Sequence, residues 1–214
     1  MVTAADISKL RAMTGVGMMD CKKALEECGG DMEKAAEYLR KKGMMKAAKL
    51  ADKIAAEGTV ASYIHAGGKI GVLLEVNCQT DFVALTEAFQ NFVRELALHI
   101  AAARPRYLDR TEVPASVLEK EKEIYSEQLK AQGKSEAMIA NILNGKLEKF
   151  YEEVCLVDQV YVKDESKKIK DLLAAMTAET GEKVTVRRFA RYELGEGIAK
   201  KTQNFADEVA EQLK

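Results

Sequence analysis

The chain has 214 residues, of which 47% are hydrophobic, enough for one or two small domains with real cores. Its 33 Lys and Arg residues nearly balance its 34 Asp and Glu residues, so the net charge of −1 gives no electrostatic case for nucleic acid or a membrane surface as the main partner. The apolar runs are too short to span a membrane, and the first residues do not read as a secretion signal. We therefore expect a cytoplasmic protein.

The first 45 residues predict a compact bundle of three short helices. Apolar residues recur at helical spacing over residues 4–13 and 18–28, and a third helix is expected from the capping residue Asp31 to about residue 42. Glycines separate the three segments. The side chains predicted to face inward are Ile7, Leu10, Met13, Met18, Cys21, Leu25, Cys28, Ala35, Tyr38 and Leu39.

The period of the pattern changes after an Ala- and Lys-rich stretch, residues 46–56, which predicts a helical linker. Two strand-like runs then meet at Gly67 and Gly68, which favours a hairpin because glycine accepts the positive φ angles of a tight turn. A third strand candidate follows more than a hundred residues later, at 183–194. Residues 57–200 should therefore form an α+β core with a small three-stranded antiparallel sheet packed on helices.

Helical patterns fill the chain between these strands. Residues 86–103 carry an apolar stripe, and residues 115–154 predict two charged amphipathic helices that form a projecting helical hairpin. A short helix is expected at 171–177, and residues 201–214 predict a C-terminal helix.

No pattern typical of a catalytic site is present in the sequence. The phosphate-binding, zinc-protease and serine-hydrolase motifs are missing, and the two histidines, His65 and His99, have no partners at metal-ligand spacing. The four cysteines form no CxxC pair and are best read as reduced, mostly buried thiols. We therefore expect a protein that acts by binding, without covalent chemistry, a metal or a cofactor.

The stretch NCQTDFVA, residues 77–84, is the strongest candidate site. Thr80 is placed to cap a helix, and Asp81 in the first turn favours the helix dipole, so both have a purely structural explanation. Phe82 is ambiguous. Stepping back from Phe89 at helical spacing leads to Leu85 and then to Phe82, so its ring could plug the core or stand exposed as a wedge.

Three strings of the sequence resemble the bacterial elongation factor Ts family. They are TGVGMMDCKKAL at 14–25, VNCQTDFVA at 76–84 and RRFARYELGEGI at 187–198. Residues 133–150, GKSEAMIANILNGKLEKF, also resemble the coiled-coil segment of that family. The likeness covers nearly the whole chain in order.

The resemblance implies a guanine-nucleotide exchange factor for elongation factor Tu. By position, Thr80, Asp81, Phe82 and Val83 would dislodge Mg²⁺ from Tu, with Phe82 pointing outward as a wedge. Residues 1–45 would be a domain like the ubiquitin-associated domain that docks on the nucleotide-binding domain of Tu, and the C-terminal helix would bind a second Tu domain. The residues implied in partner binding are Val16, Gly17, Met18, Met19 and Phe205.

One departure from the family pattern concerns the core. Longer members carry two related copies of the hairpin-plus-helix unit, whereas this chain has one. A single small sheet would leave an edge or a face uncovered, so we expect two chains to pair as a homodimer that binds two Tu molecules. The alternatives are a binding adaptor that uses residues 1–45 and a ribosome-associated factor that uses the basic doublets.

Overall fold

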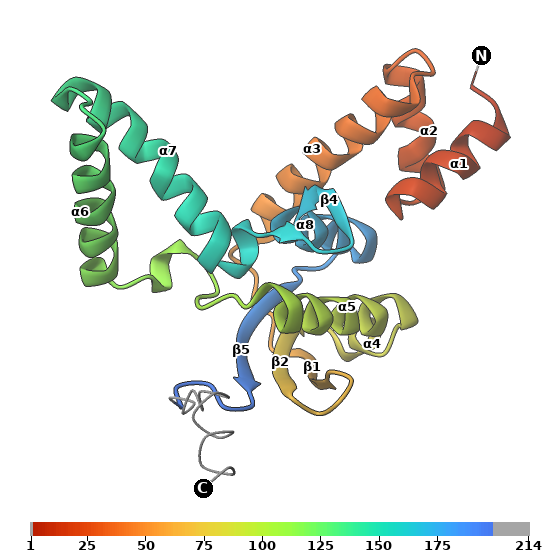
Figure 1. The fold of residues 1–214 in the computed structure, drawn as a ribbon. Helices are drawn as coiled ribbons and strands as arrows, with labels where there is room; N and C mark the ends of the chain where they lie inside the picture. The colour runs from red at the N-terminus through yellow and green to blue at the C-terminus, as the bar shows by residue number, and fades with distance from the viewer. Residues whose placement is uncertain (1, 199–214) are drawn as a thin grey trace, which may run out of the picture.

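The computed structural model describes residues 2–198, so the predicted helix at 201–214, with Phe205, lies outside the described residues. The fold is α+β, as predicted. A three-stranded sheet packs on helices at the centre, while the helices of the N-terminal segment and a long helical hairpin extend from it in different directions (Figure 1).

The N-terminal bundle consists of α1 (Ala4–Thr14), α2 (Met18–Glu27) and the first half of α3 (Met32–Leu50). Thr3 and Asp6 form a capping box at α1, and Asp31 caps α3. The prediction of inward-facing residues is wrong for Met13, Met18 and Tyr38, which are exposed, because three short helices cover only a narrow stripe of one another. The buried residues of the bundle are Leu10, Cys21, Ala24, Leu25, Ala35 and Leu39.

Helix α3 does not end near residue 42 but runs without interruption to Leu50, so the first residues of the predicted helical linker at 46–56 are a continuation of α3. Gly43, within α3, is buried against α8 (Ile169–Thr180). A β-carbon at Gly43 would lie 3.5 Å from the Ala178 β-carbon and 3.6 Å from the Ala174 carbonyl oxygen. The glycine therefore allows close packing of two helices, and the second half of α3 belongs to the core.

The sheet has the strand order β1–β2–β5, and both pairs are antiparallel. Strands β1 (Glu57–Ile64) and β2 (Ile70–Cys78) form the predicted hairpin, in which Gly67 and Gly68 have φ angles of 85° and 67°. Strand β5 (Thr185–Glu193) pairs with β2 across more than a hundred residues, which confirms the sequence-distant pairing.

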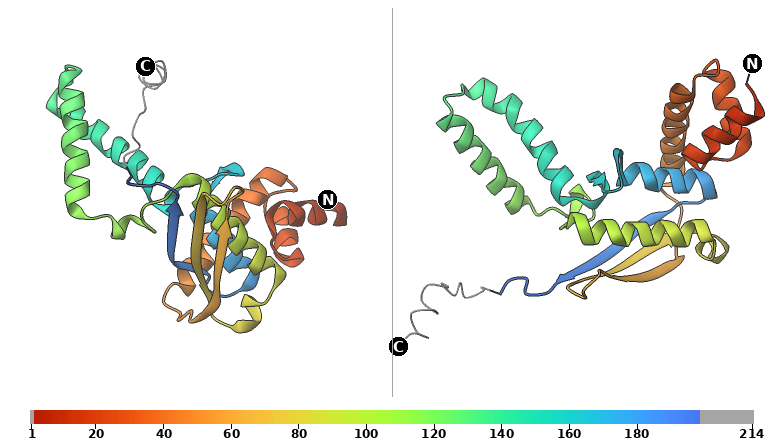
Figure 2. Two further views of the ribbon diagram at one scale, coloured as in Figure 1. Left: turned by 60° about the horizontal axis from the view of Figure 1, so that its bottom comes forward. Right: turned by 45° about the vertical axis from the view of Figure 1, so that its right-hand side comes forward.

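Helix α5 (Glu87–Ala103) lies along one face of the sheet (Figure 2) and shares a buried core with β2, β5 and α8. The centre of this core is built by Leu74, Val76, Phe89, Leu96, Ile100 and Ile169. A small two-stranded sheet, β3 (Val160–Tyr161) with β4 (Asp164–Lys168), was not predicted because β3 has only two residues and β4 is entirely polar.

The helical hairpin is formed by α6 (Ala115–Ala131) and α7 (Glu136–Val154) and projects from the core, as predicted (Figure 1). Its base is tied down by Arg110, in the short 3-10 helix Arg110–Glu112. The Arg110 guanidinium donates to Glu148 at 2.8 Å and to the buried Asp158, in the 3-10 helix Leu156–Asp158, at 2.7 Å. It also lies over the ring of Tyr151, 4.6 Å from the ring centre.

Candidate functional site

The segment 80–83 leaves the end of β2 and turns at once into the four-residue helix α4 (Asp81–Ala84). Thr80 has extended backbone angles and its hydroxyl accepts a hydrogen bond from the Val83 amide at 3.4 Å, so it caps α4 as predicted. The Asp81 carboxylate accepts from the Phe82 amide at 2.9 Å. The Thr80 and Asp81 side chains therefore accept from the Val83 and Phe82 amides in the first turn, and these hydrogen bonds fix the orientation of both side chains.

Phe82 points away from the core. Its side chain is 80% exposed and that of Leu85 is 78% exposed, whereas Ala84 is buried and Val83 is packed against the core cluster. The interpretation of Phe82 as a core plug is therefore wrong. Extrapolation from Phe89 fails because α4 and α5 are separate helices.

The break between α4 and α5 lies at Leu85 and Thr86. Thr86 has an extended ψ of 144° and starts a new helix by accepting from the Phe89 amide. Its hydroxyl also donates to the Val83 carbonyl at 2.8 Å, and the Gln90 side chain donates to the Ala84 carbonyl at 2.6 Å. Helix α5 thus anchors α4 by hydrogen bonds. The extended residue between the two helices means that side chains of α4 do not continue the helical spacing of α5.

Cys78 supports the segment from below. Its buried thiol donates to the Thr80 carbonyl at 3.1 Å. Burial raises the pKa of Cys78, and the nearby Glu182 carboxylate raises that pKa further, so the sulfur keeps the proton that it donates at neutral pH.

A carboxylate that the sequence did not single out also contacts the segment. Glu182, in the loop between α8 and β5, accepts hydrogen bonds from the Gln79 and Thr80 amides and from the Thr80 hydroxyl. It lies more than a hundred residues further along the chain, and no motif or spacing in the sequence points to it. Only the pairing of β2 with β5 brings the two together.

The second set of candidate residues spans the turn before α2 and the first two residues of α2. Gly17 is the residue before α2, and Val16 is half-buried against the bundle core, with its carbonyl accepting from the Cys21 thiol at 3.4 Å. Met18 and Met19 are exposed, Met19 at 67%. The start of α2 therefore presents two flexible apolar side chains to solvent.

The two candidate segments lie at the same end of the molecule. Helices α1 and α2 and helix α4 are all found on the side opposite the hairpin α6–α7 in Figure 1 and in the right-hand view of Figure 2. One partner of protein size could contact both segments while leaving the hairpin free.

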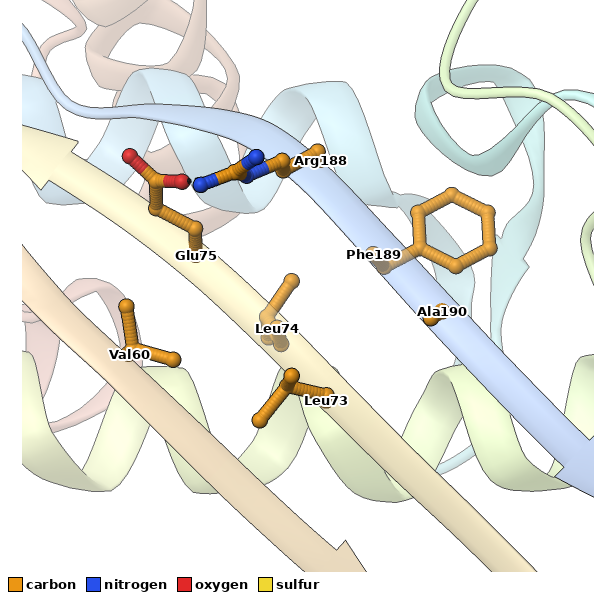
Figure 3. Close-up of a pocket in the computed structure, with 7 residues that line it drawn as sticks. All are labelled: Val60, Leu73, Leu74, Glu75, Arg188, Phe189 and Ala190. Atoms are coloured by element: carbon orange, nitrogen blue, oxygen red, sulfur yellow. Dashed lines mark hydrogen bonds and ion pairs between the residues drawn. The ribbon is translucent and has the colours of Figure 1, made fainter.

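A third surface is the face of the sheet that α5 does not cover. The side chains that alternate with the core positions point to this face, and Leu73 at its centre is 51% exposed. Glu75 pairs there with Arg188 at 2.6 Å across β2 and β5 (Figure 3). Large exposed apolar residues lie near Leu73 on the neighbouring strands or just beyond them. Val60 and Ile64 are in β1, Tyr192 is in β5 and Leu194 follows β5.

Within residues 2–198, the His, Cys, Asp and Glu side chains form no group of three or more that could hold a metal ion. In the same part of the chain no helix is long and apolar enough to cross a membrane.

Comparison with known proteins gives matches over nearly the whole chain. The family model described as "Elongation factor TS" matches residues 4–196. The chain is 56% identical over 209 residues to elongation factor Ts of Geobacter metallireducens, covering 98% of this chain and 97% of that protein. It is 57% identical over 209 residues to elongation factor Ts of Anaeromyxobacter sp. strain K, covering 98% of this chain and 95% of that protein.

Proposed function

The chain belongs to the elongation factor Ts family of translation elongation factors, and from this we propose that it is a guanine-nucleotide exchange factor for elongation factor Tu. It binds Tu in the GDP-bound and nucleotide-free states and accelerates the release of GDP without covalent chemistry or a cofactor of its own. The place of this activity is the cytoplasm.

The single observation that carries this proposal is the exposure of Phe82. A phenylalanine ring that is 80% exposed on a capped and anchored helix contributes little to folding. Its burial is available to a partner instead, and complete burial of such a side chain is worth about 1.5–3 kcal/mol. Asp81 stands beside it at the exposed start of α4.

In the proposed mechanism, Thr80, Asp81, Phe82 and Val83 enter Tu beside its nucleotide and dislodge Mg²⁺. Magnesium requires nearly ideal octahedral coordination, so a small shift of its surroundings is enough to release it. Its loss removes charge stabilisation from the GDP phosphates. The chain then holds nucleotide-free Tu until GTP binds, and by linkage GDP and this protein weaken each other's binding to Tu by the same factor.

The N-terminal turn supplies the docking contact in this proposal. Val16, Gly17, Met18 and Met19 contact the nucleotide-binding domain of Tu, with the two methionines adapting to its surface. Phe205, outside the described residues, is proposed to contact a further domain of Tu. Residues 1–45 thus act as a domain like the ubiquitin-associated domain, one that places the segment 80–83 at its target.

A homodimer that binds two Tu molecules is the proposed assembly. The uncovered sheet face carries several large exposed apolar residues, among them Val60, Ile64, Leu73 and Tyr192, and soluble proteins usually bury such groups. A second copy of the chain would cover it and leave the segment 80–83 of each chain free for its own Tu. Leu73→Asp should therefore give a monomeric mass at micromolar concentration, whereas Val162→Asp, at another exposed apolar residue, should not.

The test of exchange is the release of a fluorescent GDP analogue from Tu, measured with and without this protein. We expect strong acceleration that saturates with its concentration and changes little between low and moderate salt. Unchanged release together with binding to Tu would favour an adaptor role. Unchanged release together with RNA or ribosome binding that falls steeply with salt would favour a ribosome-associated factor.

A further inference from the structure

We infer that Glu182 is a positioning residue for the segment 80–83, holding it in the geometry that exchange requires. This inference rests on the proposed exchange function and adds to it a residue from a distant part of the chain. Glu182 does not itself contact the partner in this scheme. It acts through Thr80 and the backbone beside it.

The Glu182 carboxylate makes three hydrogen bonds to two consecutive residues. One oxygen accepts from the Gln79 amide at 3.1 Å and from the Thr80 amide at 3.0 Å, and the other oxygen accepts from the Thr80 hydroxyl at 2.7 Å. These amides lie at the end of β2, where the chain leaves the sheet. Hydrogen bonds to a carboxylate are shorter and stronger than those between neutral groups. The point where the chain turns out of the sheet is therefore fixed.

The third of these bonds also sets the cap of α4. A hydroxyl carries a single proton, and Thr80 donates it to Glu182. The lone pairs of the Thr80 oxygen are then left to accept from the Val83 amide. Loss of the carboxylate frees the hydroxyl to rotate, which weakens the cap and loosens the helix that presents Phe82.

The loop that carries Glu182 is itself held on both sides. Gly181 ends α8 with a left-handed φ of 78°, and the Val184 amide donates to the Thr177 hydroxyl at 3.2 Å in the core. The adjacent Lys183 binds the segment as well, since its amide donates to the Gln79 side-chain oxygen at 2.9 Å. The carboxylate is thus presented from a rigid support, as a positioning group must be.

Lys183 extends the same support to the N-terminal bundle. Its ammonium group donates to the Ala51 carbonyl at 2.5 Å and to the Lys53 carbonyl at 3.1 Å, just after α3 ends. The loop between α8 and β5 therefore binds both Thr80 and the chain that follows α3.

The experiment is a double-mutant cycle on GDP-analogue release from Tu at saturating concentrations of the full-length protein. It compares wild type, Glu182→Ala, Phe82→Ala and the double variant. The matched control is Glu165→Ala, because the exposed Glu165 carboxylate makes no ion pair or hydrogen bond within the described residues. Glu182→Gln, which keeps one acceptor oxygen, is measured alongside.

We expect Glu182→Ala to slow release roughly tenfold, because small misplacements of positioned groups have effects of this order or larger. In the Phe82→Ala background the same change should have little further effect, since a missing ring cannot be misplaced. Glu182→Gln should recover part of the rate, and Glu165→Ala should match wild type. Hydrogen exchange at the Gln79 and Thr80 amides should become faster in Glu182→Ala.

Independent, multiplying effects of Glu182→Ala and Phe82→Ala would overturn the inference. So would a Glu182→Ala variant that loses stability while its folded fraction keeps the full rate per molecule. If wild type and Glu182→Ala accelerate GDP release equally, only the role of Glu182 is overturned. Absence of acceleration by wild type overturns the proposed function, and the role of Glu182 with it.

Discussion

The first turns of α4 and α5 have nearly the same local chemistry, but their phenylalanine side chains have opposite environments. Each begins with a capping threonine and an acidic residue, and each carries a phenylalanine in its first turn. The Thr80 hydroxyl accepts from the Val83 amide at 3.4 Å, and the Thr86 hydroxyl accepts from the Phe89 amide at 3.3 Å. Yet Phe89 is completely buried and Phe82 is 80% exposed.

The difference lies in the position of each ring relative to the sheet. Phe82 is the second residue of α4 and Phe89 the third residue of α5, so the two rings leave their helices at different angles. Helix α5 continues for 17 residues along the sheet, whereas α4 has four residues and buries chiefly Ala84. Local capping therefore fixes that a helix starts, and tertiary packing decides whether its aromatic residue serves the core or a partner.

The largest effect is expected for Phe89→Ala, which removes a fully buried ring from the centre of the core. Loss of its transfer free energy and the resulting cavity should lower the free energy of unfolding by about 3–5 kcal/mol. Urea unfolding followed by circular dichroism measures this change. The fraction that stays folded should still accelerate GDP release. A small loss of stability would contradict the assignment of Phe89 to the core that stabilises the fold.

Phe82→Ala should produce the complementary result. The rate of GDP release should fall about 30-fold, which corresponds to about 2 kcal/mol of lost apolar burial in the complex. The free energy of unfolding should stay within about 0.5 kcal/mol of wild type, as is usual for exposed residues. Ile54→Ala, at an exposed apolar residue in the connection after α3, is the control and should change neither quantity. Equal destabilisation by Phe82→Ala and Phe89→Ala would remove the contrast between the two rings.

Structural features that depend on residues close together in the chain could be predicted from the sequence. The threonine caps, the glycine turn of the hairpin and the apolar stripe of α5 each follow from residues a few positions apart. The direction of Phe82 could not be predicted from the pattern, because one extended residue at Thr86 resets the helical phase. The resemblance to the Ts family supplied the outward orientation.

Other features escaped the sequence because they depend on contacts between distant segments. The continuation of α3 past residue 42 depends on Gly43, which allows α3 to pack closely on α8. Glu182 looks like any surface acid until β5 pairs with β2 and brings its carboxylate to Thr80. The exposure of Met18 likewise depends on how the three helices of the bundle meet.

A smaller effect is expected when the two caps are removed. Thr80→Ala and Thr86→Ala should each cost about 1 kcal/mol of helix stability. Thr86→Ala should appear mainly as a lower free energy of unfolding, because α5 is part of the core. Thr80→Ala should appear mainly as slower GDP release, because α4 contributes little burial but carries Phe82. Identical profiles for the two variants in urea unfolding and in GDP release would contradict this division.

The smallest effect concerns the thiol beneath α4. Because burial and the Glu182 charge raise the pKa of Cys78 above its ordinary value of 9.0, the folded protein holds this proton more tightly than the unfolded chain. The resulting stabilisation is fully present below about pH 9 and is lost as the pH rises through the folded-state pKa. The stability advantage of wild type over Cys78→Ala should therefore shrink at high pH, by a fraction of the ~1.4 kcal/mol per pH unit that one proton can carry.

Urea unfolding of both proteins under reducing conditions at pH 7, 8, 9 and 10 measures this difference directly. Thr86→Ala is the matched control at the neighbouring helix, because a threonine hydroxyl does not titrate in this range and its cost should stay constant. A wild-type advantage over Cys78→Ala that is equally constant would mean that folding does not raise the pKa of this thiol, against the effect expected from its burial and the Glu182 charge.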